Sequence, residues 1–549
     1  MKTVLFRWIK ANKAIFANAG SLIGTWGVTS GLGFVYWWLA ARVFVPQEVG
    51  IGSASISVMT LLGTICMMGL GTLLITELPR QPENAGSLLS TSLIIVGIVG
   101  GVGGFLFAMV APSVSASFAP LRTSMGIILL FALGVSLTSI TLVLDMAMIG
   151  LLLGGVQLWR NLLFALSKLI ILYLLSRWFA QAAGMGIYAA WAIGNVLSLV
   201  LLVGLVLCKK SWRRKRYLPE WSLLRKMGGV AMQHHLLNLA LAAPTLILPV
   251  MVTVMLSAQA NAWFYVAWMV ANFVFVVPGS LTMVLHAINS AQKATLKNRA
   301  RMTLSLAFAV SLVAIIVLVF GAKLVLSFFG SAYASEASWT LQILVLAAIP
   351  SIIKSHYISI CRIYDRITEA LLGMIPAGLL ELGGAAAGAH VAGLVGLSLG
   401  WVGAMAIESI FMLPTLYNVV FAKEQDEQSE QAATDPVWLM DTALLPAIGS
   451  GYGGSEPLWL INSALQPAIG RKPAEAQSVW LLETTRLPAI KPPARQTPHR
   501  TLRKARLEVF HTSKHRALHT TQPTTDPSTD PEFAKVAHDN SPVFEDEVR

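Results

Sequence analysis

Apolar stretches alternate with short polar joints along the chain up to about residue 421. About twelve of them hold ~20 residues or more, which is enough for an α-helix to cross a hydrocarbon core ~30 Å thick. They lie near residues 19–41, 50–75, 88–111, 125–144, 158–176, 183–207, 230–255, 262–285, 304–320, 341–361, 370–387 and 391–417. The pattern therefore predicts an all-α membrane protein.

Composition and cysteine usage narrow the class further. The chain is 55% hydrophobic and 12% charged, which leaves too little polar surface for a soluble domain of this size. Cys66, Cys208 and Cys361 show neither metal-ligand spacing nor a disulfide framework, so we interpret them as free thiols. Because a phosphate-binding loop and a nucleophile constellation are also missing from the sequence, we expect no enzymatic activity, no cofactor and no metal site.

Basic residues in the joints set the expected topology. Most of them fall on one side of the membrane, and only Arg42, Arg122, Arg177 and Lys323 fall on the other. By the positive-inside rule, both termini are expected to be cytoplasmic, in the inner or plasma membrane of the cell.

Two basic segments help to divide the chain. The run KKSWRRKR at residues 209–216 separates two expected six-helix lobes, residues 19–208 and 227–422, within a basic linker at 209–226. We expect this linker to contact anionic lipid rather than nucleic acid. Basic residues also interrupt any signal-peptide core within residues 1–18, so we expect an uncleaved amphipathic helix there, lying in the membrane interface.

Several short motifs, taken in order, resemble a known family. They are ARVFVPQEVG at 41–50, Gly69-Leu70-Gly71, RNLLF at 160–164 with Lys168-Leu169, AWFYVAW at 262–268, and FGSAYA at 329–334. Over residues 19–421 the chain resembles the oligosaccharide flippases of the polysaccharide-exporter type, in the superfamily of multidrug, oligosaccharidyl-lipid and polysaccharide exporters. This resemblance implies two six-helix lobes arranged as a V, alternating access, and an oligosaccharide carried on a polyprenyl pyrophosphate.

Two features separate the chain from other members of that superfamily. Its antiporters commonly carry an acidic coupling residue in the first helix, whereas residues 21–41 contain no Asp or Glu. Its lipid II flippases have two more helices after the twelfth, whereas this chain stays polar after residue 422. The joints at 41–48 and 254–261 also occupy equivalent places in the two halves, as expected for repeated bundles.

Ionisable side chains inside apolar stretches are costly in a bilayer and are therefore candidates for function. They are Lys168, His234, His235, Lys354, His356, Glu381 and Glu408. The lysines and histidines would present positive charge to a pyrophosphate or acidic sugar in a water-filled cavity. Alternatively, Lys168 or Lys354 pairs with Glu381 or Glu408 and locks helices together. A third interpretation applies to Glu408 alone, whose protonation would follow the conformation of the lobes.

Other positions have two interpretations each. His234 and His235 lie ~100° apart on a helix, so at most one is expected to line the cavity. Asp145 and Arg160 bracket the fourth joint and either close a gate as an ion pair or are solvated loop charges. The aromatic cluster at residues 36–38 favours an interfacial belt over stacking on sugars. Proline residues at 244, 249 and 278 fall inside expected spans and would permit bending.

The tail carries an internal repeat. Residues 423–549 are rich in Pro, Thr, Glu and Gln, which predicts a disordered cytoplasmic segment. Its three copies place Trp438, Trp459 and Trp480 21 residues apart, followed by Pro-Ala-Ile at Pro446, Pro467 and Pro488. The copies are docking motifs for a cytoplasmic protein, tethers to the membrane, or a duplication without function.

These observations favour a flippase that moves a lipid-linked oligosaccharide to the outer leaflet for surface polysaccharide assembly. Its expected partners are membrane lipids and that substrate. The alternatives are a multidrug or organic-cation antiporter and a membrane scaffold that recruits synthesis enzymes through its tail.

Overall fold

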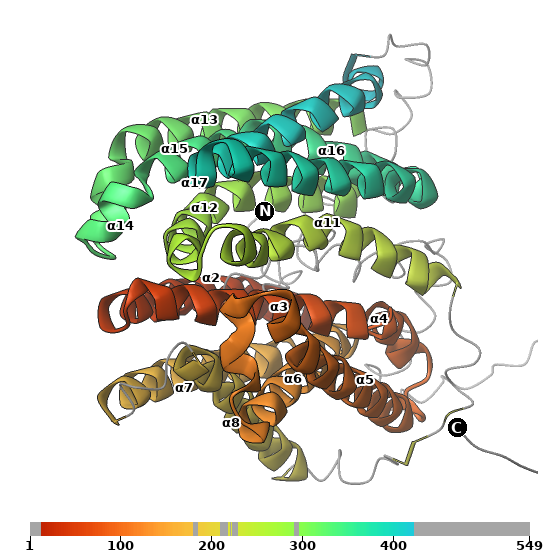
Figure 1. Ribbon diagram of the computed structural model, residues 1–549. Coiled ribbons are helices and arrows are strands. Elements are labelled where there is room, and N and C mark those ends of the chain that lie inside the picture. Colours follow the sequence, from red (N-terminus) through yellow and green to blue (C-terminus); the bar gives the residue numbers. More distant parts are fainter. Residues whose placement is uncertain are drawn as a thin grey trace, which may run out of the picture. The chain divides into compact units, whose positions relative to one another are not determined.

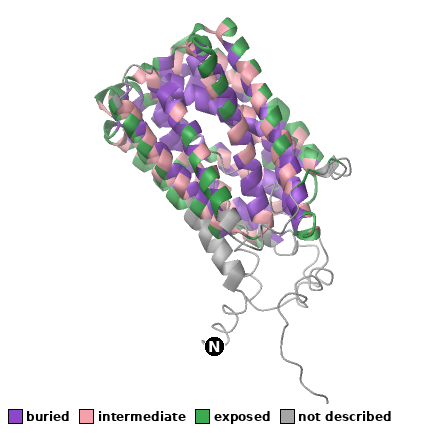
Figure 2. Ribbon diagram, turned by 90° about the horizontal axis from the view of Figure 1, so that it is seen from below, coloured by how far each residue is buried: buried purple, intermediate pink, exposed green. Residues whose placement is uncertain are grey.

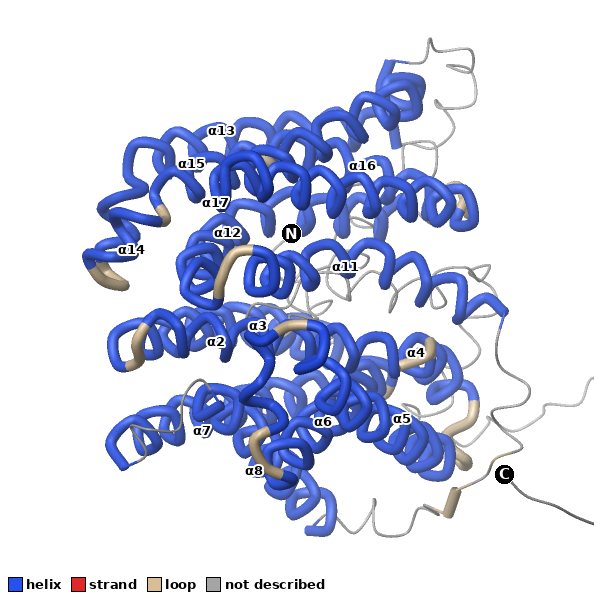
Figure 3. Tube along the Cα trace, viewed as in Figure 1, coloured by secondary structure: helices blue, strands red, loops and turns tan. Residues whose placement is uncertain are grey.

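The computed structural model describes residues 13–178, 185–208, 218–219, 221, 229–289 and 296–421. Its helices are α2 (Lys13–Val43), α3 (Pro46–Cys66), α4 (Leu70–Arg80), α5 (Ala85–Val114), η1 (Ala116–Arg122), α6 (Met125–Gly150), α7 (Gly154–Trp178), α8 (Met185–Cys208), α11 (Gly229–Met255), α12 (Ala258–Asn289), α13 (Leu296–Ser327), α14 (Ser331–Glu336), α15 (Ser338–Leu346), α16 (Ala348–Ile363) and α17 (Ile367–Phe421). Every regular element in these ranges is helical (Figures 1 and 3). The expected all-α membrane protein is confirmed.

The number of membrane crossings agrees with the apolar pattern. In the described ranges, 10 helices or helix pairs are long and apolar enough to cross a membrane. One of them, α17, has 55 residues with non-helical backbone at Ala392 and Gly393, so it forms two arms that are each long enough to cross. Helix α2, with 31 residues, adds another candidate.

Helix α3 lies between the two halves of the chain. It packs against α6 and α8 of the N-terminal half and against α11 and α12 of the C-terminal half, and 83% of its apolar stretch of 18 residues is buried. Small residues such as Gly50, Ser53 and Ala54 allow neighbouring backbones to approach closely. The second apolar stretch nevertheless does not form one helix as expected. It breaks into α3 and α4 at Met68 and Gly69, which both have positive φ.

The two arms of α17 form a helical hairpin in the C-terminal half. Glycines lie at facing positions of the arms, Gly384 opposite Gly400 and Gly388 opposite Gly396. A Cβ at Gly388 would lie 2.0 Å from the carbonyl oxygen of Gly396, so a larger residue would push the arms apart. The hairpin packs against α11, α15 and α16, and thereby brings residues of both arms beside α16.

The joints that were expected to be equivalent in the two halves have the same construction. Two residues separate α2 from α3, and two separate α11 from α12. The helices that follow the joints then meet, since a Cβ at Gly50 would lie 1.6 Å from the carbonyl oxygen of Ala258. The related joints therefore form a contact between the halves of the chain.

Burial differs between central and peripheral helices. Figure 2 shows exposed residues on the outer faces of the bundle and buried residues on faces that turn toward other helices. In α13 only 17% of the residues in an apolar stretch of 18 residues are buried, and Phe320 on this helix is 85% exposed. Exposed apolar faces of this kind suit contact with lipid tails.

The structure departs from the expected organisation at the aromatic cluster of residues 36–38 and at the start of the first span. The interpretation of residues 36–38 as an interfacial belt is wrong for Tyr36 and Trp37, which are fully buried because they fill the space between α2, α8 and α12. Helix α2 begins at Lys13, before the expected start of the first span, and the prolines of α11 and α12 do lie inside helices. The basic linker, except for residues 218, 219 and 221, and the whole repeat-bearing tail lie outside the described residues.

Candidate functional site

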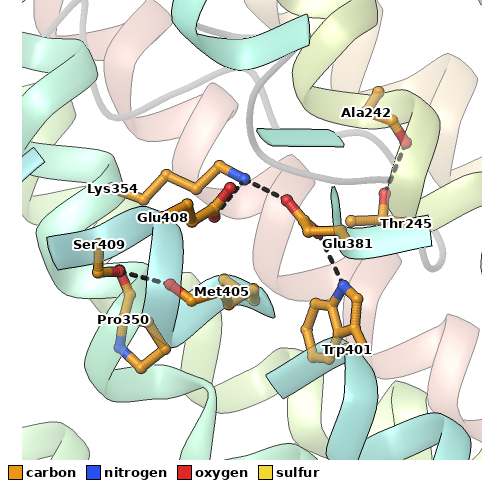
Figure 4. A network of polar contacts seen from close by, with 9 residues as sticks. All are labelled: Ala242, Thr245, Pro350, Lys354, Glu381, Trp401, Met405, Glu408 and Ser409. Atoms are coloured by element: carbon orange, nitrogen blue, oxygen red, sulfur yellow. Dashed lines mark hydrogen bonds and ion pairs between the residues drawn. The ribbon is translucent and has the colours of Figure 1, made fainter. Parts of the chain in front are cut away.

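Three ionisable residues meet in the C-terminal half. Lys354 of α16 donates hydrogen bonds to Glu381 of the first arm of α17 and to Glu408 of the second arm, the latter at 2.8 Å between Nζ and Oε1 (Figure 4). Their side chains are 13%, 2% and 4% exposed, respectively. We call Lys354, Glu381 and Glu408 the charge cluster. Pairing of Lys354 with one glutamate was one alternative from the sequence, and the structure pairs it with both.

The indole of Trp401 provides a second hydrogen bond to the Glu381 carboxylate. Trp401 Nε1 donates to Glu381 Oε2 at 2.7 Å, from the second arm of α17 (Figure 4). The Trp401 ring meets the ring of Trp268 on α12 with centroids 4.8 Å apart. The cluster is therefore linked through aromatic packing to α12, which itself packs against α3 of the other half. Sequence reasoning missed Trp401, because its distance of 20 residues from Glu381 gives no sign of a contact across a hairpin.

Lys168 occupies a different environment. Its Nζ lies 3.5 Å from the centroid of the Trp191 ring, 4.7 Å from that of Phe164 and 5.0 Å from that of Tyr36. The side chain is fully buried, so rings from α2, α7 and α8 surround the ammonium group. Cation–π attraction of this kind is worth ~2 kcal/mol or more when the cation is desolvated.

Asp145 and Arg160 form a buried ion pair between α6 and α7. Arg160 Nη2 lies 2.7 Å from Asp145 Oδ2 and 2.7 Å from Asn161 Oδ1. The interpretation as solvated loop charges is wrong, because both side chains are almost completely enclosed by the N-terminal half. Asn161, which the sequence did not single out, orients the pair and is itself held by Gln157, whose carbonyl oxygen accepts from Asn161 Nδ2.

The neighbouring histidines face different partners. His234 interacts electrostatically with Arg362 of α16, whereas His235 lies next to Gly69 at the start of α4. Both are buried. Arg362, near the end of α16, is 3% exposed and donates to Asn238 Oδ1 at 2.8 Å. His356 contacts Thr303 and the carbonyl oxygen of Ile352.

The arrangement holds positive charge at four buried positions and compensates it in different ways. Lys354 meets carboxylates, Arg160 meets one carboxylate and an amide, Arg362 meets an amide, and Lys168 meets aromatic rings. Within the described ranges, no group of three or more His, Cys, Asp or Glu residues is placed to hold a metal ion. The tail positions Trp438, Trp459, Trp480, Pro446, Pro467 and Pro488 lie outside those ranges.

Solved structures share the fold. A multidrug resistance MATE family transporter of the MOP superfamily, in an inward-facing conformation, is 15% identical with a TM-score of 0.54, over 72% of this chain and 95% of that chain. A MATE structure in the straight conformation is 14% identical with a TM-score of 0.50, over 74% and 96%. The lipid II flippase MurJ, in an inward closed conformation, is 14% identical with a TM-score of 0.49, over 80% and 96%.

A match to a protein family identifies the family of the chain as well as its fold. Residues 15–296 match the family described as "Polysaccharide biosynthesis protein", whereas no curated protein matches the chain. The resemblance seen in the short motifs is thereby confirmed. Because the match spans more than half of the 549 residues, the chain is a multi-pass membrane protein that belongs to the polysaccharide biosynthesis protein family.

Proposed function

We propose that the chain is a flippase that moves a polyprenyl-pyrophosphate-linked oligosaccharide from the cytoplasmic to the outer leaflet, for surface polysaccharide assembly. The match to the polysaccharide biosynthesis family over residues 15–296 carries this proposal. The similarity in fold to MATE family transporters supports transport as the activity. In this role the protein makes and breaks no covalent bond, and it acts in the inner or plasma membrane with both termini in the cytoplasm.

Buried hydrogen-bond donors support an anionic substrate. Lys354, His234 and His235 lie in α16 and α11, which pack against the α17 hairpin or against α3. When the halves of the chain separate, His234 and His235 can donate hydrogen bonds to a pyrophosphate, whereas Lys354 can do so only after leaving Glu381 and Glu408. Lys168 would reach a substrate only in a conformation that opens its ring of aromatic side chains. We assign Asp145 and Arg160 a gating role that depends on separation of α6 from α7.

The proposal is tested by the lipid-linked glycans of cells with and without this gene. Deletion is expected to cause one polyprenyl-linked oligosaccharide to accumulate, as measured by mass spectrometry, and re-expression of the full chain is expected to remove it. An unchanged lipid pool, in cells that make such glycans and lack a second flippase, would contradict the proposal. Purified protein in vesicles then shows whether the accumulated lipid changes leaflet.

The similarity to multidrug resistance transporters favours a second candidate, an antiporter of drugs or organic cations. Ion-driven efflux of an organic cation from vesicles, with no movement of lipid-linked oligosaccharide, would select it. The composition of the first helix disfavours this candidate, because residues 21–41 contain no carboxylate that could bind a coupling cation.

A third candidate, a scaffold for synthesis enzymes, depends on the tail repeats. Truncation after residue 422 separates it from the flippase. A flippase is expected to keep moving lipid without the tail, whereas a scaffold would lose its effect on polysaccharide assembly. A cytoplasmic protein that binds the repeats is then expected to lose its membrane recruitment after Trp438, Trp459 and Trp480 are replaced together.

A further inference from the structure

The charge cluster contains one more carboxylate than it has cations. Lys354 supplies one positive charge, while Glu381 and Glu408 supply two negative charges when both are ionised. All three side chains are largely buried, and an uncompensated charge in such a place is costly. A single proton would neutralise the cluster.

Hydrogen bonding distinguishes the two carboxylates. Both oxygens of Glu381 accept, Oε1 from Lys354 and Oε2 from Trp401, so its ionised form is stabilised. Glu408 accepts from Lys354 through Oε1 only, and its buried Oε2 has no hydrogen-bond partner in the described part of the chain. Oε2 of Glu408 is therefore the position where a proton displaces no existing hydrogen bond.

Other charged groups on the surrounding helices are engaged elsewhere or lie near helix ends. Helix α15 carries no ionisable residue, and the ionisable residues of α13 (Lys297, Arg299, Arg301 and Lys323) lie near its ends. Those of α11, His234 and His235, lie near its start. On α16, His356 contacts Thr303 and Arg362 contacts Asn238, and on α17, Glu369 pairs with Arg366 while His390 lies beside the bend of the hairpin. Lys354 and Glu381 are the charged groups that face Glu408.

We propose that Glu408 binds and releases one proton at Oε2, and that this proton couples the movement of the α17 hairpin to transport. Proton binding at Glu408 does not depend on the proposed function, whereas its coupling to transport rests on that function. Proton binding forms an O–H bond at Glu408 with a proton taken from water, while Lys354 remains an ammonium ion. Lys354 then pairs one to one with Glu381, its attraction to Glu408 weakens, and the second arm of α17 is released from α16.

The first test measures the proton alone. Full-length purified protein in lipid vesicles is taken through a pH titration, and the carbonyl stretch of protonated carboxyl groups is followed by infrared difference spectroscopy. We expect one buried carboxyl signal that disappears in Glu408→Gln and persists in Glu369→Gln, an exposed carboxylate of the same helix. A signal that persists in Glu408→Gln and disappears in Glu381→Gln, or no buried signal in the native protein, would overturn the proposal.

Folding is checked in the same samples. Glu408→Gln resembles the protonated side chain in shape and charge, so its unfolding temperature is expected to match that of the native protein at low pH. Glu408→Asp, which keeps an ionisable carboxyl group, is expected to restore a signal and thus serves as a second variant. Failure of Glu408→Asp to restore any signal in a folded protein would contradict the assignment.

The second test adds transport. Vesicles loaded with the lipid-linked oligosaccharide from deletion cells are given a pH gradient, and movement of the lipid between leaflets is followed. The native protein and Glu369→Gln are expected to respond to the gradient, whereas Glu408→Gln loses the response. If no lipid moves but the infrared signal behaves as expected, the proposed substrate fails and the proton site stands. If lipid movement in Glu408→Gln still responds to the pH gradient as it does in the native protein, the coupling fails.

Discussion

Asn261 Nδ2 donates a hydrogen bond to the carbonyl oxygen of Gly50 at 2.8 Å, across 211 residues of sequence. The same amide group lies 3.0 Å from the Ser53 hydroxyl, so one side chain at the start of α12 binds two positions at the start of α3. Asn261 is fully buried, and Gly50 lets the helices approach until only a hydrogen atom fits between them. If the halves separate during transport, this contact has to break.

Replacing Asn261 by Ala is expected to loosen the junction of the halves. It removes two hydrogen bonds from a buried position, at a cost of ~1–3 kcal/mol. Hydrogen–deuterium exchange measured by mass spectrometry is expected to rise in peptides from the starts of α3 and α12. Asn272→Ala provides a matched control, because the Asn272 amide bonds within its own helix, to the carbonyl oxygen of Trp268. Equal exchange in both variants would contradict the role given to Asn261.

Asp145 and Arg160 are expected to behave as a buried pair in a double-mutant cycle. Asp145→Asn or Arg160→Met alone leaves a buried charge with a poorer partner and is expected to lower the free energy of unfolding by ~3–5 kcal/mol. Asp145→Asn combined with Arg160→Met removes both charges and is expected to cost less than the sum of the two single changes. Denaturant unfolding in detergent measures these values.

The exposed pair of Arg80 with Glu77 gives the comparison for this cycle. The Arg80 side chain is 43% exposed, and pairs of this kind are worth ~0–1 kcal/mol. Glu77→Gln is therefore expected to change stability little. Additive effects of the Asp145 and Arg160 substitutions would mean that their ion pair contributes nothing beyond the separate side chains.

Much of the fold follows from the apolar pattern, because a bilayer imposes a minimum helix length wherever the chain crosses it. The break at Gly69 was missed, since an apolar run does not reveal a residue with positive φ inside it, whereas the bend at Gly393 lies within a few residues of the expected break between residues 387 and 391. The sequence also singled out Lys168 and Lys354 equally, as cations in apolar surroundings. Their environments differ because carboxylates from both arms of α17 reach Lys354, whereas aromatic rings reach Lys168. Such pairings depend on tertiary contacts that spacing along the chain does not encode.

The aromatic surroundings of Lys168 lead to a prediction about stability. Trp191→Leu removes the ring nearest to the ammonium group together with part of the packing against Tyr36 and Phe164. It is expected to lower the free energy of unfolding by ~3–5 kcal/mol, from lost packing and lost cation–π attraction. In a Lys168→Met background the same change is expected to cost less, because no cation then depends on the ring. An equal cost in both backgrounds, measured by thermal unfolding, would exclude a contribution from the cation.

Gly393 provides a test of the α17 hairpin that depends on backbone conformation alone. Its φ of 55° and ψ of −133° lie in a region that is strained for residues with a Cβ, yet no atom lies within 4 Å of the position where a Cβ would be added. Gly393→Ala is therefore expected to lower the free energy of unfolding by ~1–3 kcal/mol through strain. Gly403→Ala, in the second arm, also meets no atom within 4 Å but lies in regular helix, and is expected to be neutral or stabilising by up to ~1 kcal/mol. Thermal unfolding of the two variants under identical conditions decides the matter. If both alanines have the same effect, the bend at Gly393 is not held in the left-handed conformation, and the two arms of α17 do not depend on it.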